Sequence, residues 1–283
     1  KNINNNQISK SVTVYDKSKS VIDVIRKERL CDNISKDVKS AVKDADLVIL
    51  SVPLSSYKEI LLEGKDHFKD NTIITDTGSV KKEINTIFEN LNLKNIFWVA
   101  SHPIAGTEES GPQAGFKELF KDRWTIICEN EKTKKDQLEK LKKFWEFLGS
   151  RVKTMNIEDH DNILALTSHL PHLIAYNIVR TAIGTDNKYR ESIIKYSAGG
   201  LRDFTRIASS DPIMWRDIFI DNSANILKTI DEFSNNLKDF RKAIAEKNGD
   251  KLIRIFASTK NVRQEIVKAK QEINLPDFGR KKD

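Results

Sequence analysis

The chain has 283 residues, of which 39% are hydrophobic and 31% charged, which predicts one large or two medium domains with buried cores. Lysine and arginine total 48 against 41 acidic residues, and the formal charge of +7 suits anionic ligands such as phosphates or carboxylates. The basic residues are spread along the chain without interleaved aromatic residues, so nucleic acid is not an expected partner. A merely solvated basic surface is the alternative interpretation.

The cysteine content and the length of the apolar runs indicate in which compartment the protein works. Cys31 and Cys128 are the two cysteines, and neither a disulfide framework nor a CxxC metal motif is present, which indicates a reducing compartment. The longest apolar runs are too short to span a bilayer, and no signal peptide is visible. We therefore expect a cytoplasmic protein with no membrane partner.

The first half of the chain alternates short β-branched or aromatic runs with polar segments that are compatible with helices. Strands are expected at Val12–Tyr15, Leu47–Val52, Thr72–Thr75, Ile96–Ala100, Trp124–Cys128 and Arg151–Met155. Helices are expected at Val21–Arg29, Ser55–Phe68, Lys81–Leu91 and Lys134–Leu148. This alternation predicts an α/β Rossmann-type domain with a mainly parallel sheet, in which ligands bind at the carboxyl ends of the strands.

From residue 158 onward the pattern is helical. Helices are expected at Asp159–Arg180, Glu191–Ser197, Pro212–Glu246 and Asp250–Ile273. Pro171 should kink the first of these or begin a new helix. The sequence therefore predicts a dinucleotide-binding domain over residues 1–155 and an all-helical domain over residues 156–283.

Asp16 follows the first expected strand. An acid at the tip of the second strand of a dinucleotide-binding half-sheet hydrogen-bonds the adenosine ribose and favours NAD over NADP. A turn or helix N-cap aspartate is the alternative. No glycine precedes Gly64, so the first strand and the glycine loop are expected upstream of Lys1. If the protein never had them, the dinucleotide interpretation fails.

The next three strand ends also carry polar residues or tight turns. Together with Asp16, the residues expected to bind the cofactor are Ser51, Val52, Pro53, Asp76, Gly78 and Ser79. Gly78 would permit a close approach of the ligand, and Ser79 is expected to cap a helix that opens at about Val80. Ordinary helix capping is the alternative. His102 ends the fourth strand, on the side of the sheet where these groups should converge.

Three histidines of the helical half raise the question of a metal. His160, His169 and His172 could share a zinc ion, but no HExxH motif and no carboxylate or cysteine pattern accompanies them. We therefore expect no metal, and instead hydrogen-bonded histidines packed beneath a cleft.

Arg202 and Arg206 are four residues apart and would project from one helix face. Two guanidinium groups on one face suit a dicarboxylate, because arginine binds carboxylates in a bidentate manner. Pairing with Asp203, Asp211 or Asp217 is the alternative.

Four motifs in order resemble those of the prephenate/arogenate (cyclohexadienyl) dehydrogenases of tyrosine biosynthesis: DTGSVK, SHPIAGTEESG, SHLPHLIA and GGLRDFTRIASSDPIMWRDI. The resemblance runs from about residue 12 to residue 222. It implies an NAD-dependent oxidative decarboxylation of a cyclohexadienyl dicarboxylate, in which hydride goes to the nicotinamide and the ring carboxylate leaves as carbon dioxide. It also implies a homodimer formed through the helical domain.

The resemblance implies roles for single residues. His102 would take the proton of the ring hydroxyl, Ser79 would contact the same hydroxyl near the nicotinamide, and Arg206 would hold a substrate carboxylate. A neutral imidazole is the usual base near pH 7. Further substrate-binding positions implied are Thr107, Glu108, His172, Arg202 and Trp215, the last approaching the partner subunit's site. The motifs do not choose between prephenate and arogenate, since both substrates carry the ring hydroxyl and the ring carboxylate.

Two other functions stay open. A dehydrogenase of the β-hydroxyacid type has the same two-domain plan, but it normally relies on a lysine in the helix after the domain boundary, and residues 156–180 contain no lysine. A non-enzymatic NAD-binding protein would need no histidine at a strand end facing an arginine pair.

Overall fold

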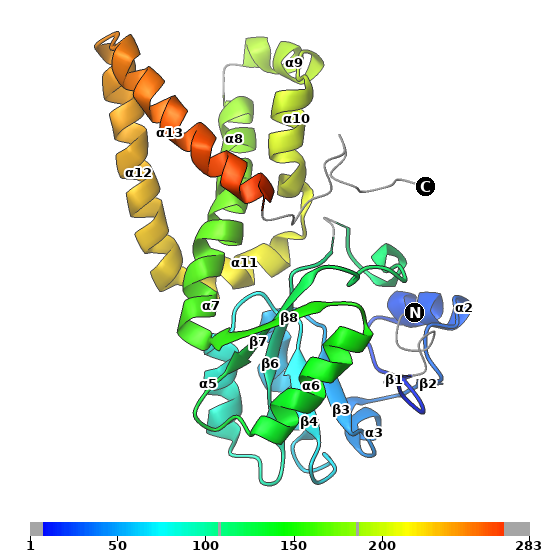
Figure 1. The fold of residues 1–283 in the computed structure, drawn as a ribbon. Helices are drawn as coiled ribbons and strands as arrows, with labels where there is room; N and C mark the ends of the chain where they lie inside the picture. The colour runs from blue at the N-terminus through cyan, green and yellow to red at the C-terminus, as the bar shows by residue number, and fades with distance from the viewer. Residues whose placement is uncertain (1–7, 107–108, 185–186, 269–283) are drawn as a thin grey trace. The chain divides into compact units, whose positions relative to one another are not determined.

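The short apolar runs of the first half form strands, most of them parallel (Figure 1). The computed structural model describes residues 8–106, 109–184 and 187–268, so Thr107 and Glu108 lie outside the described residues. β1 (Thr13–Val14) pairs in parallel with β2 (Asn33–Ile34). β3 (Leu47–Leu50), β4 (Ile73–Asp76) and β5 (Phe97–Trp98) form a parallel sheet with β4 in the centre.

The expected strand Ile96–Ala100 proves to be two successive strands. β5 pairs with β4, and β6 (Ala100–Pro103) then pairs antiparallel with β7 (Trp124–Glu129), which pairs in parallel with β8 (Arg151–Asn156). His102 lies inside β6, opposite Ile126, so the prediction that it ends a strand is wrong. The apolar run stops before His102, but the backbone stays extended because β7 continues to pair with it.

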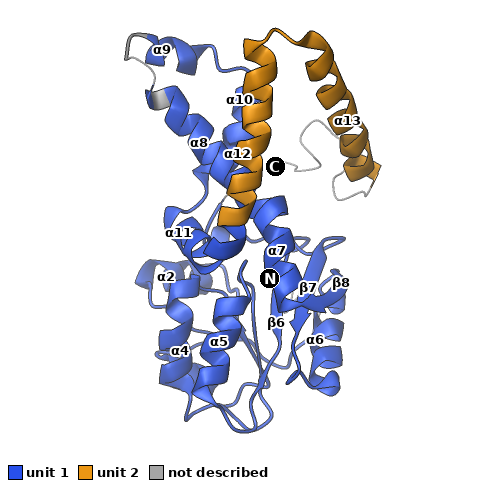
Figure 2. Cartoon of the chain, turned by 90° about the vertical axis from the view of Figure 1, so that its left-hand side faces the viewer, with its two compact units in different colours: residues 1–226 blue, residues 227–283 orange. Residues whose placement is uncertain are grey.

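All but the first of the helices of this half bury side chains spaced four residues apart, and that first helix buries Ile25 alone. These helices are α2 (Lys19–Lys27), α3 (Val38–Val42), α4 (Tyr57–Gly64), α5 (Lys82–Leu91) and α6 (Lys135–Phe147). In α5 the pair is Ile84 and Phe88, and in α6 it is Leu141 and Trp145. Such pairs share one helix face, and each buried side chain contributes about 1.5–3 kcal/mol. Figure 2 shows α4 and α5 on one side of the strands and α6 on the other.

After β8, the regular elements of the described residues are all helical. They are α7 (Ile157–Leu164), the π-helical η3 (Ala165–His169), α8 (Leu170–Gly184), α9 (Asn187–Lys195), α10 (Gly199–Thr205), the 3-10 turn η4 (Arg206–Ser209), α11 (Pro212–Asp221), α12 (Ser223–Ala245) and α13 (Gly249–Lys268). Pro171 lies in the first turn of α8, directly after the π-helical turn, so the helix changes type beside the proline as the sequence predicted. The single helix expected over 212–246 is divided at Asn222, the C-cap of α11.

The chain divides into two compact units, residues 1–226 and residues 227–283 (Figure 2). In the first unit, Ile157 of α7 and Ile218 of α11 are buried in the same cluster as Leu50 and Ile74 of the sheet. The early helices of the second half are therefore part of the sheet's own core. The boundary near residue 155 stays a prediction about domains, since compactness alone groups α7 to α11 with the strands.

The second unit contains α12 from Leu227 onward and all described residues of α13. The rings of Phe240 and Phe256 stack there with centroids 6.0 Å apart, and Lys251 Nζ lies 3.3 Å from an oxygen of Asp239. In the described part of the chain, no helix combines the length and apolar character needed to cross a membrane.

Candidate active site

Three of the predicted strand ends meet at one edge of the sheet. The backbone N–H of Thr77 donates to the carbonyl of Leu50 at 3.1 Å, so the segment after β4 lies beside the segment after β3 that holds residues 51–53. The N–H of Ser101 donates to Asp76 Oδ1 at 3.0 Å, which brings the neighbouring His102 to the same place. The structure thus places residues 51–53, 76–79 and 102 together.

The loop at residues 51–53 is partly exposed and is fixed from the helical side. Val52 is half-buried against the core, whereas Ser51 and Pro53 are exposed. Just beyond them, the N–H of Ser55 donates to Asp217 Oδ2 of α11 at 3.2 Å. This contact joins the loop after β3 to the helices of the second half.

Asp76 is fully buried and surrounded by donors of its own chain. Its Oδ2 accepts hydrogen bonds from the Lys81 ammonium and, at 2.9 Å, from the N–H of Gly78. The hydroxyl of Tyr57 lies 3.5 Å from the same oxygen. Because the carboxylate is enclosed, any contribution of Asp76 to cofactor binding is indirect, through the loop that it holds.

Position 78 requires glycine, because the surrounding atoms leave no room for a side chain. A Cβ at this position would lie 2.7 Å from a methyl of Leu54 and 2.9 Å from Asp76 Oδ2, and both are packed in place. The glycine therefore lets the loop after β4 lie directly on the core beside β3. Ser79, the next residue, is half-buried.

The prediction that Ser79 caps the following helix is wrong. The N-cap of α5 is Lys81, and no side chain of the loop makes the cap hydrogen bond. The cap comes instead from Asp161 of α7, whose two carboxylate oxygens accept the N–H groups of Lys81 and Lys82, each at 2.9 Å. A residue 80 positions away satisfies the helix N-terminus, so no local pattern could reveal it.

Lys81 is a site residue that sequence reasoning missed. Its side chain is fully buried, forms an ion pair with Asp76 and donates to the carbonyl of Ser101 at 2.9 Å. A buried ion pair costs desolvation that is offset only when its geometry and further hydrogen bonds are good, as they are here. The lysine within the DTGSVK motif was the available signal, but its burial depends on the folded sheet.

His102 is 8% exposed, and its Nδ1 lies 2.9 Å from Nε2 of His160. Burial lowers the pKa of His102 well below its usual 6.5, and His160, Lys81 and His169 act in the same direction. Since the imidazole is neutral at pH 7, it is in the state that a base requires.

Behind His102 a second buried histidine meets a carboxylate. His160 is fully buried, and its Nδ1 lies 2.7 Å from Asp161 Oδ1. Burial is the largest influence on the pKa of His160 and lowers it, although Asp161 acts in the opposite direction. The sequence offered His160 only as a packed histidine or a zinc ligand, and gave no reason to select Asp161.

His169 is buried between the loop of Ser79 and the end of α11. Its Nδ1 lies 3.1 Å from the amide nitrogen of Asn222, which also donates to the carbonyl of Asp161 at 2.8 Å. Burial lowers the pKa of His169 to about 4, and the backbone of Ser79 is among the groups that act on it. Its Nε2 is buried without a hydrogen-bond partner among the described residues.

His172 and Trp215 stack in the helical half, and Arg206 is near enough for its charge to act on His172. The ring of His172 stacks on Trp215 with centroids 3.6 Å apart, and its Nδ1 lies 2.9 Å from the carbonyl of Ser168. Burial lowers the pKa of His172, and the nearby charge of Arg206 lowers it further. Trp215 is 5% exposed and packs inside its own chain, so its approach to a partner's site stays a prediction.

The two arginines do not share one regular helix. α10 ends at Thr205, and Arg206 begins the 3-10 turn. Arg202 is largely exposed and lies 3.6 Å from Asp203, one of the pairings that the sequence had left open. The tertiary structure thus associates Arg206 with His172 and leaves Arg202 at the surface.

Asp16 makes a local contact. Its Oδ1 accepts a hydrogen bond at 2.7 Å from the N–H of Ser18, the N-cap of α2. This is the turn role that the sequence analysis kept as an alternative. A contact with the ribose of a cofactor stays a prediction.

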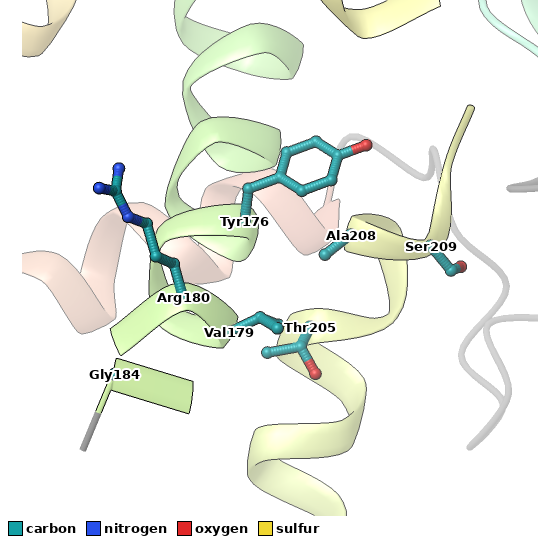
Figure 3. Close-up of a pocket in the computed structure, with 7 residues that line it drawn as sticks. All are labelled: Tyr176, Val179, Arg180, Gly184, Thr205, Ala208 and Ser209. Carbon is teal, nitrogen blue, oxygen red and sulfur yellow. The ribbon is translucent and has the colours of Figure 1, made fainter. Parts of the chain in front are cut away.

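A cavity of about 620 Å³ lies between α8 and the segment of α10 and η4 (Figure 3). Its lining residues are Tyr176, Val179, Arg180, Gly184, Thr205, Ala208 and Ser209. Neither His102 nor Ser79 lines it, so it is separate from the edge of the sheet described above. Over the described residues, no cluster of three or more histidine, cysteine, aspartate or glutamate side chains could hold a metal ion.

A mainly parallel sheet with a neutral buried imidazole beside its strand ends, joined to helices that carry histidine and arginine, defines a two-domain dehydrogenase. Comparison with known protein families identifies the family to which the chain belongs. Residues 1–154 match the nucleotide-binding domain of prephenate dehydrogenase, and residues 156–258 match its dimerization domain. The chain therefore belongs to the prephenate dehydrogenase family and is an oxidoreductase with an NAD-binding domain, as the motifs predicted.

Individual relatives agree. A cyclohexadienyl dehydrogenase of Zymomonas mobilis is 42% identical over 89% of this chain and 86% of that protein. A prephenate dehydrogenase of Bacillus subtilis is 31% identical over 84% of this chain, which spans 64% of that longer protein. The crystal structure of prephenate dehydrogenase from Aquifex aeolicus in complex with hydroxyphenyl propionate and NAD+ superposes with a TM-score of 0.86 and 32% identity, covering 94% of this chain and 92% of that chain. The predicted fold class is confirmed.

Proposed function

We propose that this chain catalyses the NAD-dependent oxidative decarboxylation of prephenate, of arogenate or of both, with His102 as the base. The observation that carries the proposal is the buried neutral imidazole of His102 at the edge where β3 and β4 end. Family membership supports the reaction class. The imidazole of His102 supports removal of the hydroxyl proton as the step that starts the reaction.

The edge of the sheet fits a nucleotide cofactor. Residues 51–53 and 77–79 follow parallel strands, where open α/β sheets bind such ligands, and Gly78 lets the second segment lie close to the first. NAD would supply a hydride acceptor there. We propose that Ser51, Val52, Pro53 and Ser79 contact the cofactor directly.

His102 would take the proton from the ring hydroxyl as hydride leaves the carbon that bears it. The ring carboxylate then departs as carbon dioxide, and its bonding electrons complete the aromatic ring and leave a phenolate. The proton held by His102 would return to that oxygen, so the atoms balance with NAD as the hydride acceptor. Base assistance of this kind typically accelerates a reaction about 10²–10⁴-fold. Ser79, whose backbone acts on buried His169, would contact the same hydroxyl.

The substrate's carboxylate would bind in the helical half. Arg206 is the cation close to His172 there, and arginine binds carboxylates through two parallel hydrogen bonds. His172 is oriented by Ser168 and Trp215, so it offers a fixed surface beside the arginine. Substrate contacts of Thr107, Glu108, Arg202 and Trp215 stay predictions from the motifs.

The proposal includes a homodimer formed through the helical domain, a cytoplasmic location and a functional boundary near residue 155. Support for the dimer comes from the match of residues 156–258 to a dimerization domain. Support for the location comes from the two free cysteines, Cys31 and Cys128, which suit a reducing compartment.

The test is an NADH absorbance assay of the full-length protein, given NAD with prephenate and then with arogenate. Turnover with either substrate establishes the reaction and names the substrate. The His102→Asn variant serves as the control for reactions that do not use the base. If folded protein that binds NAD turns over neither substrate, the proposal fails.

A further inference from the structure

Two buried residues behind His102 take no direct part in the reaction described above. His160 contacts His102, and Asp161 contacts His160, so the three side chains form a continuous line of contacts. We infer that Asp161 and His160 are positioning residues that fix the tautomer of His102, so that Nε2 is its basic atom. The inference rests on the proposed role of His102 as the base.

Asp161 is the fixed end of this line. Its side chain is 2% exposed, and both of its carboxylate oxygens accept backbone N–H groups at the beginning of α5, from Lys81 and Lys82. The positive end of the helix dipole favours a negative charge at this place. Asp161 is therefore held as a hydrogen-bond acceptor, and its position is set by a helix of the nucleotide-binding half.

Because Asp161 accepts hydrogen bonds, the ring nitrogen that carries the hydrogen can be assigned for both His160 and His102. Nδ1 of His160 lies 2.7 Å from Asp161 Oδ1, so Nδ1 must carry the hydrogen. A neutral imidazole has one N–H, which leaves Nε2 of His160 as an acceptor. That Nε2 lies 2.9 Å from Nδ1 of His102, so His102 carries its hydrogen on Nδ1 and presents a lone pair on Nε2.

Both imidazoles are neutral in the surroundings that the structure gives them. The charged or titratable groups that act on His102 are His160 of α7, Lys81 at the start of α5 and His169 of η3. Those that act on His160 are Asp161, Lys81 and Asp76. For His160, the effect of burial on the pKa is larger than the opposite effect of the carboxylates of Asp161 and Asp76. Each of the two rings therefore carries a single N–H at pH 7.

The arrangement has a consequence for the chemistry. With the hydrogen on Nε2, His102 would donate toward the substrate and could not take its proton. With the hydrogen on Nδ1, Nε2 accepts the hydroxyl proton, and the resulting charge is stabilised through His160 by the carboxylate of Asp161. A base whose orientation and tautomer are set by a third group follows the general logic of activated catalytic groups.

The first test reads the tautomers without measuring activity. Nitrogen NMR of the histidine-labelled full-length protein at pH 8 distinguishes a ring nitrogen that carries hydrogen from one that does not. The chain has five histidines, and the His102→Asn and His160→Gln variants assign the two signals. We expect hydrogen on Nδ1 of both residues. Hydrogen on Nε2 of His102 would overturn the inference.

The second test compares two substitutions of His160. Glutamine can accept from His102 Nδ1 and donate to Asp161, whereas leucine can do neither. Asp161 keeps its contacts with α5 in both variants, and thermal melting checks that both are folded. We expect His160→Leu to lower kcat about 10- to 100-fold with little change in KM, as misplacement of a catalytic group does. His160→Gln should recover most of the loss.

The outcomes distinguish the proposed role of His102 as the base from the proposed positioning role of His160 and Asp161. If His102→Asn retains turnover, the proposed base is wrong. If His102→Asn loses turnover while folded His160→Leu keeps the wild-type kcat, the base stands and the positioning role is wrong. Equal losses in the leucine and glutamine variants would also contradict the positioning role, because a role in packing alone predicts no recovery by glutamine.

Discussion

The surroundings of His102 and the segment from residue 189 to residue 209 are built in opposite ways. Around His102 the polar side chains are buried and contact one another, as in the ion pair of Lys81 with Asp76. In the second region, α10 and η4 bury no residue, and Tyr196 is 75% exposed. The polar side chains around His102 pack against other residues of the same chain, whereas the segment from residue 189 to residue 209 presents its side chains to the surface.

The difference reflects two kinds of task. A base and the groups that tune its pKa need a dry, fixed environment, since burial is the largest influence on the pKa of His102. The exposed aromatic and aliphatic side chains of Ile194, Tyr196 and Phe204 lie within the dimerization domain that the family comparison identifies. We expect a second copy of the chain to cover them.

The largest effect is expected from the buried region. His102→Asn should lower kcat by about 10²–10⁴-fold, because asparagine cannot take the hydroxyl proton. The KM for the substrate should change little, since Arg206 and His172 are untouched. Steady-state kinetics measure both parameters, and an unchanged melting temperature serves as the control. Turnover comparable to that of the unaltered protein would contradict the assignment.

The stability of the same region depends on the buried ion pair. Lys81→Met would leave the Asp76 carboxylate buried without its ammonium partner, which should lower the free energy of unfolding by about 3–5 kcal/mol. Lys82→Met is a matched control, since Lys82 is exposed. It should change the free energy by less than about 0.5 kcal/mol. Urea unfolding measures both, and equal losses would show that burial of Lys81 is unimportant.

The two arginines test the exposed region. Arg206→Ala should raise the KM for the substrate about 10- to 100-fold, the equivalent of one or two charge-assisted hydrogen bonds, with little change in kcat. Arg202→Ala should have a much smaller effect, because Arg202 lies at the surface beside Asp203. An unchanged KM in the Arg206 variant would remove it from the carboxylate site. Equal effects would restore the arginine pair that the sequence predicted.

The smallest effect concerns pH and stability. The pKa of His169 is about 4 in the folded chain and 6.5 in its ordinary state, so between these values the unfolded chain binds more protons. Stability should therefore fall as pH falls below 6.5, and the share of His169 is about 1 kcal/mol between pH 6.5 and pH 5.5. Asp221 acts in the opposite direction, since burial raises its pKa to about 6 and its protonation favours the folded chain.

Melting curves at several pH values measure this effect. The His169→Asn variant should lose part of the slope between pH 6.5 and pH 5.5, whatever its overall stability. An identical slope in the variant and the unaltered protein would show that His169 is not held neutral by the fold.

The sequence by itself determined the alternation of strands and helices, the change to helices after residue 155, and the motifs that identify the family. These follow from local periodicity and from residue types at fixed spacing, which a linear pattern records. It also selected His102, because a histidine after an apolar run is visible without a structure. Arg206 was selected by the resemblance.

Only the tertiary structure decided how the proposed base, His102, is held. Asp161 caps α5 from 80 positions away, Lys81 is buried because Asp76 and Ser101 enclose it, and His102 lies within a strand because β7 pairs with it. Each of these depends on segments that are distant in sequence and meet only when the sheet and its helices pack together. Burial and long-range hydrogen bonds set pKa values and tautomers, and no local pattern encodes them.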